Sequence, residues 1–210
     1  MICPEENEFT ILAVGRLHPV KNHVFLIRAC AQLKQKGFPF LCIIIGEGET
    51  RKELNRLVAK LGLVRDVKII GFIEKPFFHV FYKMANLFVL TSSSEGLPLT
   101  LMEAMANEKV VLAPNITSIP EVIKDGENGF LYESGNIDDF VKKILFISEK
   151  GKSSDLIGRQ ARNQIRVNYD RRKNMELFAD TLISRLESKI HRDEEKGRLL
   201  NASERFCNYT

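Results

Sequence analysis

Phe40-Leu-Cys-Ile-Ile-Ile-Gly-Glu-Gly48 is an unbroken apolar run that ends in a glycine-rich turn. A strand with one exposed face alternates apolar and polar residues, whereas a strand buried on both faces is apolar throughout. The run therefore predicts a fully buried strand at Phe40–Ile45, and Gly46-Glu-Gly48 predicts a turn into a helix.

Similar apolar runs alternate with helical patterns as far as Tyr132. Strands are expected at Phe9–Val14, Phe40–Ile45, Val67–Ile70, Leu87–Leu90, Val110–Ala113 and, with a weaker pattern, Phe130–Tyr132. Helices are expected between them near Lys21–Lys36, Arg51–Leu61, Lys75–Met84 and Pro98–Asn107. Strand-helix alternation at this spacing is typical of a parallel sheet with helices on both faces. The predicted fold class is therefore α/β, with a six-stranded parallel sheet.

Short local patterns indicate where the helices begin and end. Gly37 and Gly62 stand where C-terminal caps belong. Thr50 and Ser118 each precede a glutamate by three residues, which is the pattern of a capping box at a helix start.

The pattern changes after Tyr132. Helices are expected at Ile137–Glu149, Ser154–Asn168 and Arg172–Ile190. The segment 191–210 is strongly charged at its start and lacks a clear apolar stripe, so we expect a frayed helix or a disordered tail there. The predicted organisation is one domain over residues 1–190 followed by a charged tail over residues 191–210.

Composition and charge exclude several classes of protein. The 210 residues include 31 Lys and Arg against 27 Asp and Glu, a net charge of +4, which is too small an excess to argue for nucleic acid. No run approaches the roughly 18 apolar residues of a membrane helix, and the acidic start of the chain does not resemble a signal peptide. The cysteines form no C-x-x-C pair and suit a reducing compartment, with Cys30 and Cys42 expected as buried apolar fillers. We therefore expect a cytoplasmic protein.

The residues that follow the predicted strands are the first candidates for a site, because open α/β sheets bind ligands beyond the carboxyl ends of their strands. Gly15, Gly46 and Gly71 each follow a strand and allow close approach of a backbone or a ligand. Arg16 and Lys21 place two cations beside a helix N-terminus, a suitable pair for a diphosphate. Taken alone, these residues also fit an ordinary strand-end turn with two solvated cations.

Glu95-Gly-Leu-Pro-Leu-Thr-Leu-Met-Glu103 places two carboxylates across a junction between a polar loop and an apolar helix. The helix N-terminus near Pro98 offers free backbone N–H groups and a positive dipole end, which together form an anion site. Helical side chains tilt toward the N-terminus, so Glu103, about 7.5 Å along the axis from Pro98, can reach back toward a ligand there. The stretch predicts a site for a phosphorylated, hydroxyl-rich ligand, with two solvated surface glutamates as the alternative.

Several common motifs are missing from the chain. It has no Asp-x-Asp motif, no G-x-S-x-G elbow and no G-x-x-x-x-G-K-[ST] loop. No histidine is spaced with Cys, Asp or Glu like a metal site, so we expect neither a metal nor a cofactor.

Five motifs in order carry a family resemblance. They are Val14-Gly-Arg-Leu17 with Lys21-Asn22, Gly46-Glu-Gly48, Gly71-Phe72, Ser94-Glu-Gly-Leu-Pro-Leu-Thr-Leu-Met-Glu-Ala-Met-Ala106 and Asp125-Gly-Glu-Asn-Gly-Phe-Leu131. Over about residues 9–185 the chain resembles the second, nucleotide-sugar-binding domain of group 1 retaining glycosyltransferases (family 4, GT-B fold). The resemblance implies a Rossmann-like sheet that forms one half of a GT-B fold.

The resemblance also implies a role for each matching residue. Arg16 and Lys21 would bind the donor diphosphate and stabilise the charge that develops on it, and Glu95 would hydrogen-bond the transferred sugar. These three are the implied catalytic residues. Glu103 would bind the ribose, and no metal would be needed. The implied donor-binding residues, many acting through their backbone, are Gly15, Gly46, Gly71, Phe72, Ile73, Gly96, Leu97, Pro98, Leu99, Thr100 and Glu103.

The resemblance covers only one of the two domains of the GT-B fold. The first domain, which holds the acceptor, has no counterpart, so we expect a fragment or one half of a split enzyme that is inactive alone. The implied reaction is hexosyl transfer from a nucleotide-diphosphate sugar to a glycan or lipid-linked acceptor, as in polysaccharide biosynthesis. It is compatible with peripheral membrane association of the full enzyme. In the intact family the last helix crosses back to the first domain, so Arg172–Ile190 is expected to expose an apolar face.

Three other functions stay open. The chain could be a non-catalytic module that binds a nucleotide or a protein partner. It could be a Rossmann-type oxidoreductase, although the dinucleotide fingerprint is missing. It could also be a sugar-nucleotide epimerase that shares the fold, although its diphosphate residues follow the transferase pattern.

Overall fold

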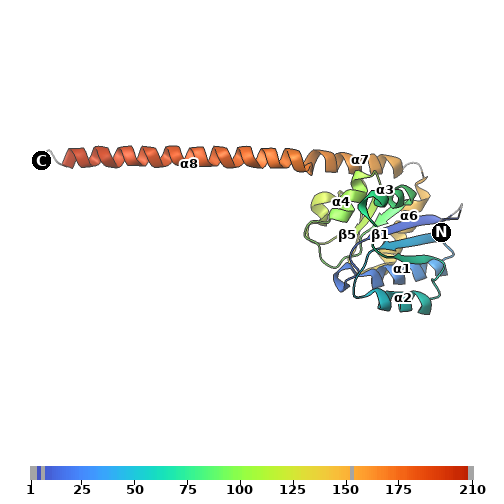
Figure 1. The fold of residues 1–210 in the computed structure, drawn as a ribbon. Helices are drawn as coiled ribbons and strands as arrows, with labels where there is room; N and C mark the ends of the chain where they lie inside the picture. The colour runs from blue at the N-terminus through green and yellow to red at the C-terminus, as the bar shows by residue number, and fades with distance from the viewer. Residues whose placement is uncertain (1–3, 6–7, 152–153, 208–210) are drawn as a thin grey trace. The chain divides into compact units, whose positions relative to one another are not determined.

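The computed structural model describes residues 4–5, 8–151 and 154–207, and within them six parallel strands form one sheet in the order β3-β2-β1-β4-β5-β6 (Figure 1). The strands are β1 (Phe9–Val14), β2 (Phe40–Ile45), β3 (Val67–Ile70), β4 (Leu87–Val89), β5 (Val110–Pro114) and β6 (Phe130–Tyr132). Every neighbouring pair is parallel. The predicted fold class is confirmed, and the strand bounds lie within one residue of those expected.

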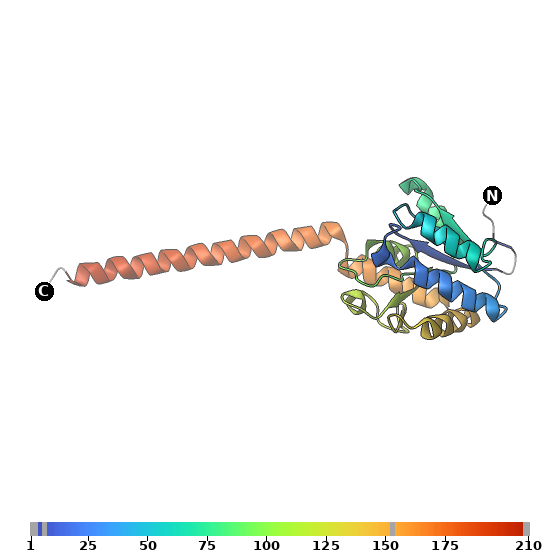
Figure 2. The same cartoon turned by 90° about the horizontal axis from the view of Figure 1, so that it is seen from below.

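Helices lie on both faces of the sheet. On one face α1 packs against α2 and α6, while α3 and α4 contact β1, β4 and β5 from the other face (Figure 1, Figure 2). The helices are the 3-10 helix η1 (Pro19–Lys21), α1 (His23–Gln35), α2 (Arg51–Lys60), α3 (Lys75–Met84), α4 (Leu99–Ala106), α5 (Ile119–Val122), α6 (Ile137–Glu149) and α7 (Ser154–Asn168).

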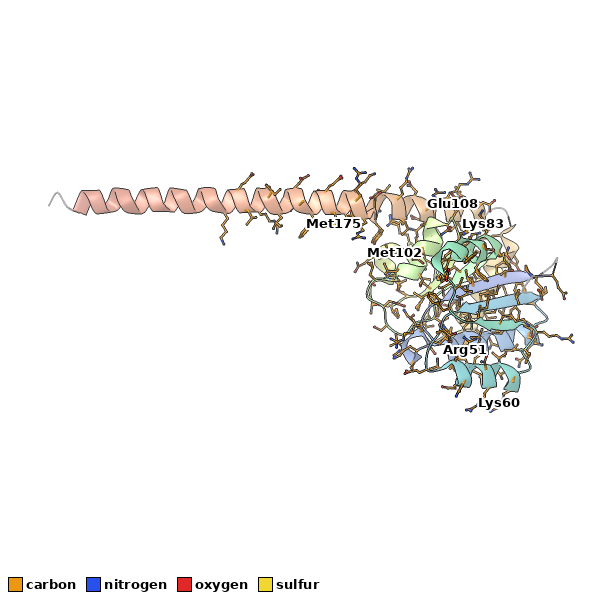
Figure 3. The ribbon with its side chains drawn as sticks, viewed as in Figure 1. Arg51, Lys60, Lys83, Met102, Glu108 and Met175 are labelled. Carbon is orange, nitrogen blue, oxygen red and sulfur yellow. The ribbon has the colours of Figure 1, made fainter. Side chains whose placement is uncertain are left out.

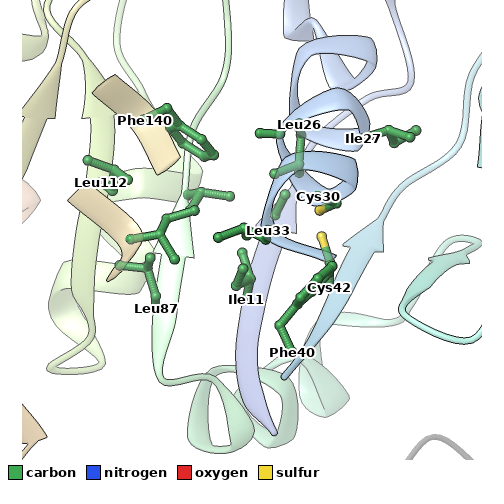
Figure 4. Packing of buried hydrophobic residues seen from close by; sticks show 14 of the residues in the cluster. Ile11, Leu26, Ile27, Cys30, Leu33, Phe40, Cys42, Leu87, Leu112 and Phe140 are labelled. Carbon is green, nitrogen blue, oxygen red and sulfur yellow. The ribbon is translucent and has the colours of Figure 1, made fainter. Parts of the chain in front are cut away.

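An apolar cluster between the sheet and α1 buries one face of the strands (Figure 4). Its fully buried members include Ile11, Leu26, Leu33, Leu87, Leu112 and Phe140. Cys30 from α1 and Cys42 from β2 are both 0% exposed and unpaired, with their sulfur atoms facing one another (Figure 4). Burial raises the pKa of the Cys30 thiol. Both cysteines are therefore buried apolar fillers, as predicted.

Local helix signals are confirmed in part. Gly37 and Gly62 have φ of 71° and 68°, the left-handed conformation of a C-terminal cap. Neither predicted capping box forms, because Thr50 and Ser118 have helical backbone angles and their side chains make no capping hydrogen bond. The predicted first helix is interrupted at Asn22, whose φ of 49° ends η1 and precedes α1.

The chain divides into two compact units, residues 1–166 and residues 167–210. The second unit contains α8 (Arg171–Cys207), which continues past residue 191, where the sequence predicted a frayed helix or a disordered tail. Strong helix formers such as Glu, Lys, Arg and Leu can continue a helix that has no apolar stripe. Within the described residues, none of the helices combines the length and the apolar character needed to span a membrane.

Candidate functional site

Three of the predicted glycines stand side by side at the carboxyl edge of the sheet. The last residues of β1, β2 and β3 are paired in register, so Gly15, Gly46 and Gly71 follow three aligned strand ends. The N–H of Gly15 donates to the Ile45 carbonyl at 3.0 Å, and the N–H of Gly46 donates to the Ile70 carbonyl at 3.0 Å. The three glycines thus form a row of neighbouring residues without side chains at this edge, here called the glycine row.

The loops that follow β1 and β4 meet where the strand order reverses. Strand β1 lies between β2 and β4, and such a reversal is where open α/β sheets bind ligands. The Thr91 hydroxyl donates to the Lys21 carbonyl at 2.9 Å, and the Ser93 N–H donates to the Val20 carbonyl at 2.9 Å. These bonds hold the Lys21 loop against the loop that carries Glu95.

Lys21 and Glu95 are in direct contact in this site. Nζ of Lys21 donates to Oε1 of Glu95 at 2.7 Å, and the Ser92 hydroxyl donates to the same oxygen at 2.6 Å. The side chains of Glu95 and Lys21 are only 8% and 26% exposed, so water and salt screen this pair weakly. The structure therefore places a candidate phosphate-binding cation and a candidate sugar-binding carboxylate in one cluster.

The backbone of Glu95 and Gly96 is held by the loop between β5 and α5. The Thr117 hydroxyl donates to the Glu95 carbonyl at 2.9 Å. The Ser118 hydroxyl donates to the Glu95 carbonyl at 3.4 Å and also to the Gly96 carbonyl. Ser118, predicted as a helix cap, instead positions the loop that carries Glu95.

The N-terminus of α4 follows this loop directly. Pro98 is the N-cap, with φ of −80° and ψ of 74°, one position before the helix begins. Leu97 and Leu99 on either side are 59% and 61% exposed, while Thr100 is half-buried. The first N–H groups of an α-helix have no partner within the helix. In α4 the N–H of Leu99 donates back to the Leu97 carbonyl at 2.9 Å, so the N–H of Thr100 is the first in the helix that an anion can use.

Glu103 is held from the neighbouring helix α3. The hydroxyl of Tyr82 donates to Oε2 of Glu103 at 3.3 Å, and Tyr82 is only 3% exposed. Burial, and then the charge of Glu103, raises the pKa of Tyr82 well above its ordinary value. The phenol therefore stays protonated and keeps donating to the exposed Glu103 carboxylate.

Arg16 and His23 flank the Lys21 loop. Arg16 is exposed, and within the described part of the chain its side chain forms no hydrogen bond or ion pair. His23 is 6% exposed, with Nδ1 at 3.3 Å from the Lys21 carbonyl oxygen. Burial, and then the charge of Lys21, lowers the pKa of His23 to about 4, so it is neutral at pH 7. The positive charge of this region therefore comes from Arg16 and Lys21.

The residues implied for base binding lie at the end of β3. Phe72 is 76% exposed, and Gly71 and Ile73 beside it are half-buried. Glu47 and Arg51 form an ion pair next to Gly71, where an added Cβ would lie 2.5 Å from Oε1 of Glu47 (Arg51 is labelled in Figure 3). An exposed aromatic ring and an ion pair therefore border this end of the glycine row.

A cavity of about 390 Å³ lies away from these residues. Phe9 and Val110, the first residues of β1 and β5, line it together with Lys83 and Glu108, so it opens at the amino edge of the sheet (Figure 3). We place the site at the carboxyl edge, where the charged groups and the α4 N-terminus converge. In the described residues, no group of three or more His, Cys, Asp or Glu is arranged to hold a metal ion.

The sequence did not identify several polar residues that support this site, among them Ser92, Tyr82 and Thr117. Ser92 lies in the polar loop before Glu95, where its spacing of three residues could have indicated a contact. Tyr82 and Thr117 reach Glu103 and Glu95 only through the packing of α3 and of the β5–α5 loop. No local sequence signal predicts such contacts.

Comparisons with known proteins match most of the chain. A glycosyltransferase of Campylobacter jejuni is 33% identical over 143 residues, which are 68% of this chain and 38% of that enzyme. Its name is N-acetylgalactosamine-N,N'-diacetylbacillosaminyl-diphospho-undecaprenol 4-alpha-N-acetylgalactosaminyltransferase. The crystal structure of Anabaena HepE in complex with UDP-glucose has 28% identity and a TM-score of 0.75, covering 85% of this chain and 49% of that one.

A second solved structure matches at its full length. The C-terminal domain of LpcC from Francisella tularensis, a glycosyl transferase group 1 family protein, has 27% identity and a TM-score of 0.69. The match covers 80% of this chain and 95% of that domain. By contrast, the chain spans less than half the length of the curated relatives that it matches. The family model for glycosyl transferases group 1 matches residues 4–164, and the chain therefore belongs to the group 1 glycosyltransferase family.

Proposed function

We propose that this chain is the donor-binding domain of a retaining glycosyltransferase, which takes a sugar from a nucleotide-diphosphate sugar and transfers it to a glycan or lipid-linked acceptor. The contact of Lys21 with Glu95 at the sheet reversal, beside the N-terminus of α4, is the observation that carries the proposal. In this proposal Lys21 is the cation for the diphosphate, and Glu95 beside it is the carboxylate for the sugar hydroxyls. The complex of HepE with UDP-glucose supports a nucleotide sugar as the ligand.

The donor is expected to lie along the carboxyl edge of the sheet. Its diphosphate binds Arg16, Lys21 and the N–H groups of Gly96, Leu97 and Thr100, which also stabilise charge on the leaving diphosphate. Its sugar hydroxyls donate to Glu95, and its ribose hydroxyls donate to Glu103, which Tyr82 orients. Its base lies against Gly71, Phe72 and Ile73. No metal has a part in this proposal.

The acceptor belongs to a second domain in this proposal. The chain matches the whole of the LpcC C-terminal domain but less than half of the relatives' length, which supports a division into a donor half and an acceptor half. In the second unit, α8 exposes apolar residues spaced three or four apart, which are Met175, Phe178, Leu182 and Leu186. We assign this stripe to contact with the acceptor domain. The name of the Campylobacter jejuni enzyme includes a diphospho-undecaprenol, which supports a lipid-linked acceptor.

Supplying the acceptor domain of a full-length relative, fused or added separately, is expected to produce sugar transfer with the anomeric configuration of the donor retained. The chain alone is expected to transfer nothing, because it provides no acceptor site. Nuclear magnetic resonance of the product reads both the transfer and the configuration. An inverted product would contradict the retaining mechanism. Binding of donor without transfer in any combination would favour a non-catalytic module instead.

A further inference from the structure

The hydrogen bonds of Lys21 and Ser92 occupy one of the two oxygens of the Glu95 carboxylate. Lys21 and Ser92 both donate to Oε1 of Glu95, at 2.7 Å and 2.6 Å. In the part of the chain that is described, Oε2 of Glu95 receives no hydrogen bond, so it can accept from a ligand hydroxyl. Ser92 is 1% exposed and keeps the carboxylate in place whether or not Lys21 is engaged.

A diphosphate at this site would compete with Glu95 for Lys21. The ammonium group is a compact charge, and its attraction to Glu95 is weakly screened because both side chains are largely buried. The Glu95 carboxylate would also repel the phosphate oxygens that approach Lys21. Both effects make the binding of a diphosphate less favourable than it would be without the carboxylate.

The sugar of a complete donor changes this balance. Its hydroxyl groups would donate to Glu95 and offset the negative charge beside the diphosphate. A nucleoside diphosphate that has lost its sugar brings no such donors. The Glu95 carboxylate therefore favours binding of the donor and disfavours binding of the product, because only the donor has sugar hydroxyls that offset its negative charge.

We propose that Glu95 weakens the binding of the nucleoside diphosphate product by competing for Lys21, and so promotes its release after the sugar has left. This role deepens the proposed function and rests on it. Glu95 then has two roles in the catalytic cycle. It accepts hydrogen bonds from hydroxyls of the bound sugar, and it pairs again with Lys21 after the sugar has been transferred. Ser92 is a positioning residue for both.

Replacing Glu95 with glutamine tests the proposal, because the amide keeps the size and the Ser92 contact but removes the charge. Glu95→Gln is expected to bind UDP or GDP, whichever the wild-type chain prefers, about tenfold more tightly. The corresponding UDP-glucose or GDP-mannose is expected to gain less affinity or to lose it. Isothermal titration calorimetry of the full chain measures each dissociation constant, and Glu95→Ala provides a second variant without the charge.

Glu103→Gln is the matched control, since it makes the same change of net charge in the same site without touching Lys21. It is expected to weaken UDP or GDP binding, because its ribose contact is impaired. The inference would be overturned if both Glu95 variants bound the nucleoside diphosphate no more tightly than the wild-type chain. It would also be overturned if Glu103→Gln strengthened this binding as much as Glu95→Gln does. If the wild-type chain bound neither UDP nor GDP, the proposed function itself would fail. If the wild-type chain bound UDP or GDP and Glu95→Gln gained no affinity, only the inference about product release would fail.

Discussion

Lys21→Ala is expected to weaken the binding of UDP or GDP by about 1.5–3 kcal/mol, the range for hydrogen bonds to charged groups. The substitution removes a cation from the diphosphate and leaves Glu95, whose side chain is 8% exposed, without its partner at 2.7 Å. The uncompensated carboxylate then adds repulsion to the lost attraction. Arg16→Ala is expected to fall in the same range. Isothermal titration calorimetry of each variant against the wild-type chain checks the prediction.

Lys34→Ala is the matched control for this substitution. Lys34 pairs with Asp66 at 2.7 Å near the C-terminal end of α1, away from the carboxyl edge of the sheet. Its removal changes the net charge equally and is expected to leave UDP and GDP affinity unchanged. Unaltered affinity in both Lys21→Ala and Arg16→Ala would remove the diphosphate assignment.

Gly46→Ala is expected to destabilise the larger unit by about 3 kcal/mol or more, at the upper end of the range for overpacking. A Cβ at this position would lie 1.9 Å from the carbonyl oxygen of Gly15 and 2.9 Å from its carbonyl carbon. Neither backbone can retreat cheaply, because Gly15 and Gly46 each donate to the neighbouring strand end at 3.0 Å. Urea unfolding followed by near-ultraviolet circular dichroism measures the change.

Gly96→Ala provides the comparison, because an added Cβ there meets nothing within 4 Å. Its effect on the free energy of unfolding is expected to stay within about 0.5 kcal/mol. A Gly46→Ala protein with the unfolding midpoint of the wild type would show that the close approach of these two loops is not required.

Most of the sheet could be predicted from the sequence because strands such as β2, β4 and β5 are buried on both faces. The run Phe40–Ile45 is apolar throughout, and β2 begins and ends where the flanking residues predicted. Gly37 and Gly62 were predictable for a similar reason, since a left-handed cap favours glycine whatever surrounds it. These signals are local and independent of the rest of the fold.

Side chains whose partners lie far away in the chain could not be placed in this way. Ser118 fits a capping box, yet its hydroxyl bonds the backbone of Glu95 and Gly96 across 22 or more residues. The sequence nominated Lys21 and Glu95 separately, but their contact across 74 residues depends on the order of β1 and β4 in the sheet. At Ser118, hydrogen bonds to a distant loop thus replace the capping box that the local pattern predicted.

The C-terminal segment was predicted less sharply, as either a frayed helix or a disordered tail. The prediction of a frayed helix or a disordered tail from residue 191 rested on the missing apolar stripe, and helix formation needs no stripe when the residues themselves favour a helix. Helix α8 accordingly continues to Cys207. Amphipathic pattern predicts which helices pack against a core, and it is a weaker guide to where a helix ends.

Titration of UDP, GDP and NAD into the wild-type chain tests the donor-binding claim most directly. We expect saturable heat from UDP or GDP, retained in Lys34→Ala and strongly reduced in Lys21→Ala, and no binding of NAD. Failure of both nucleoside diphosphates to bind would contradict the claim, and binding of NAD in their place would favour an oxidoreductase.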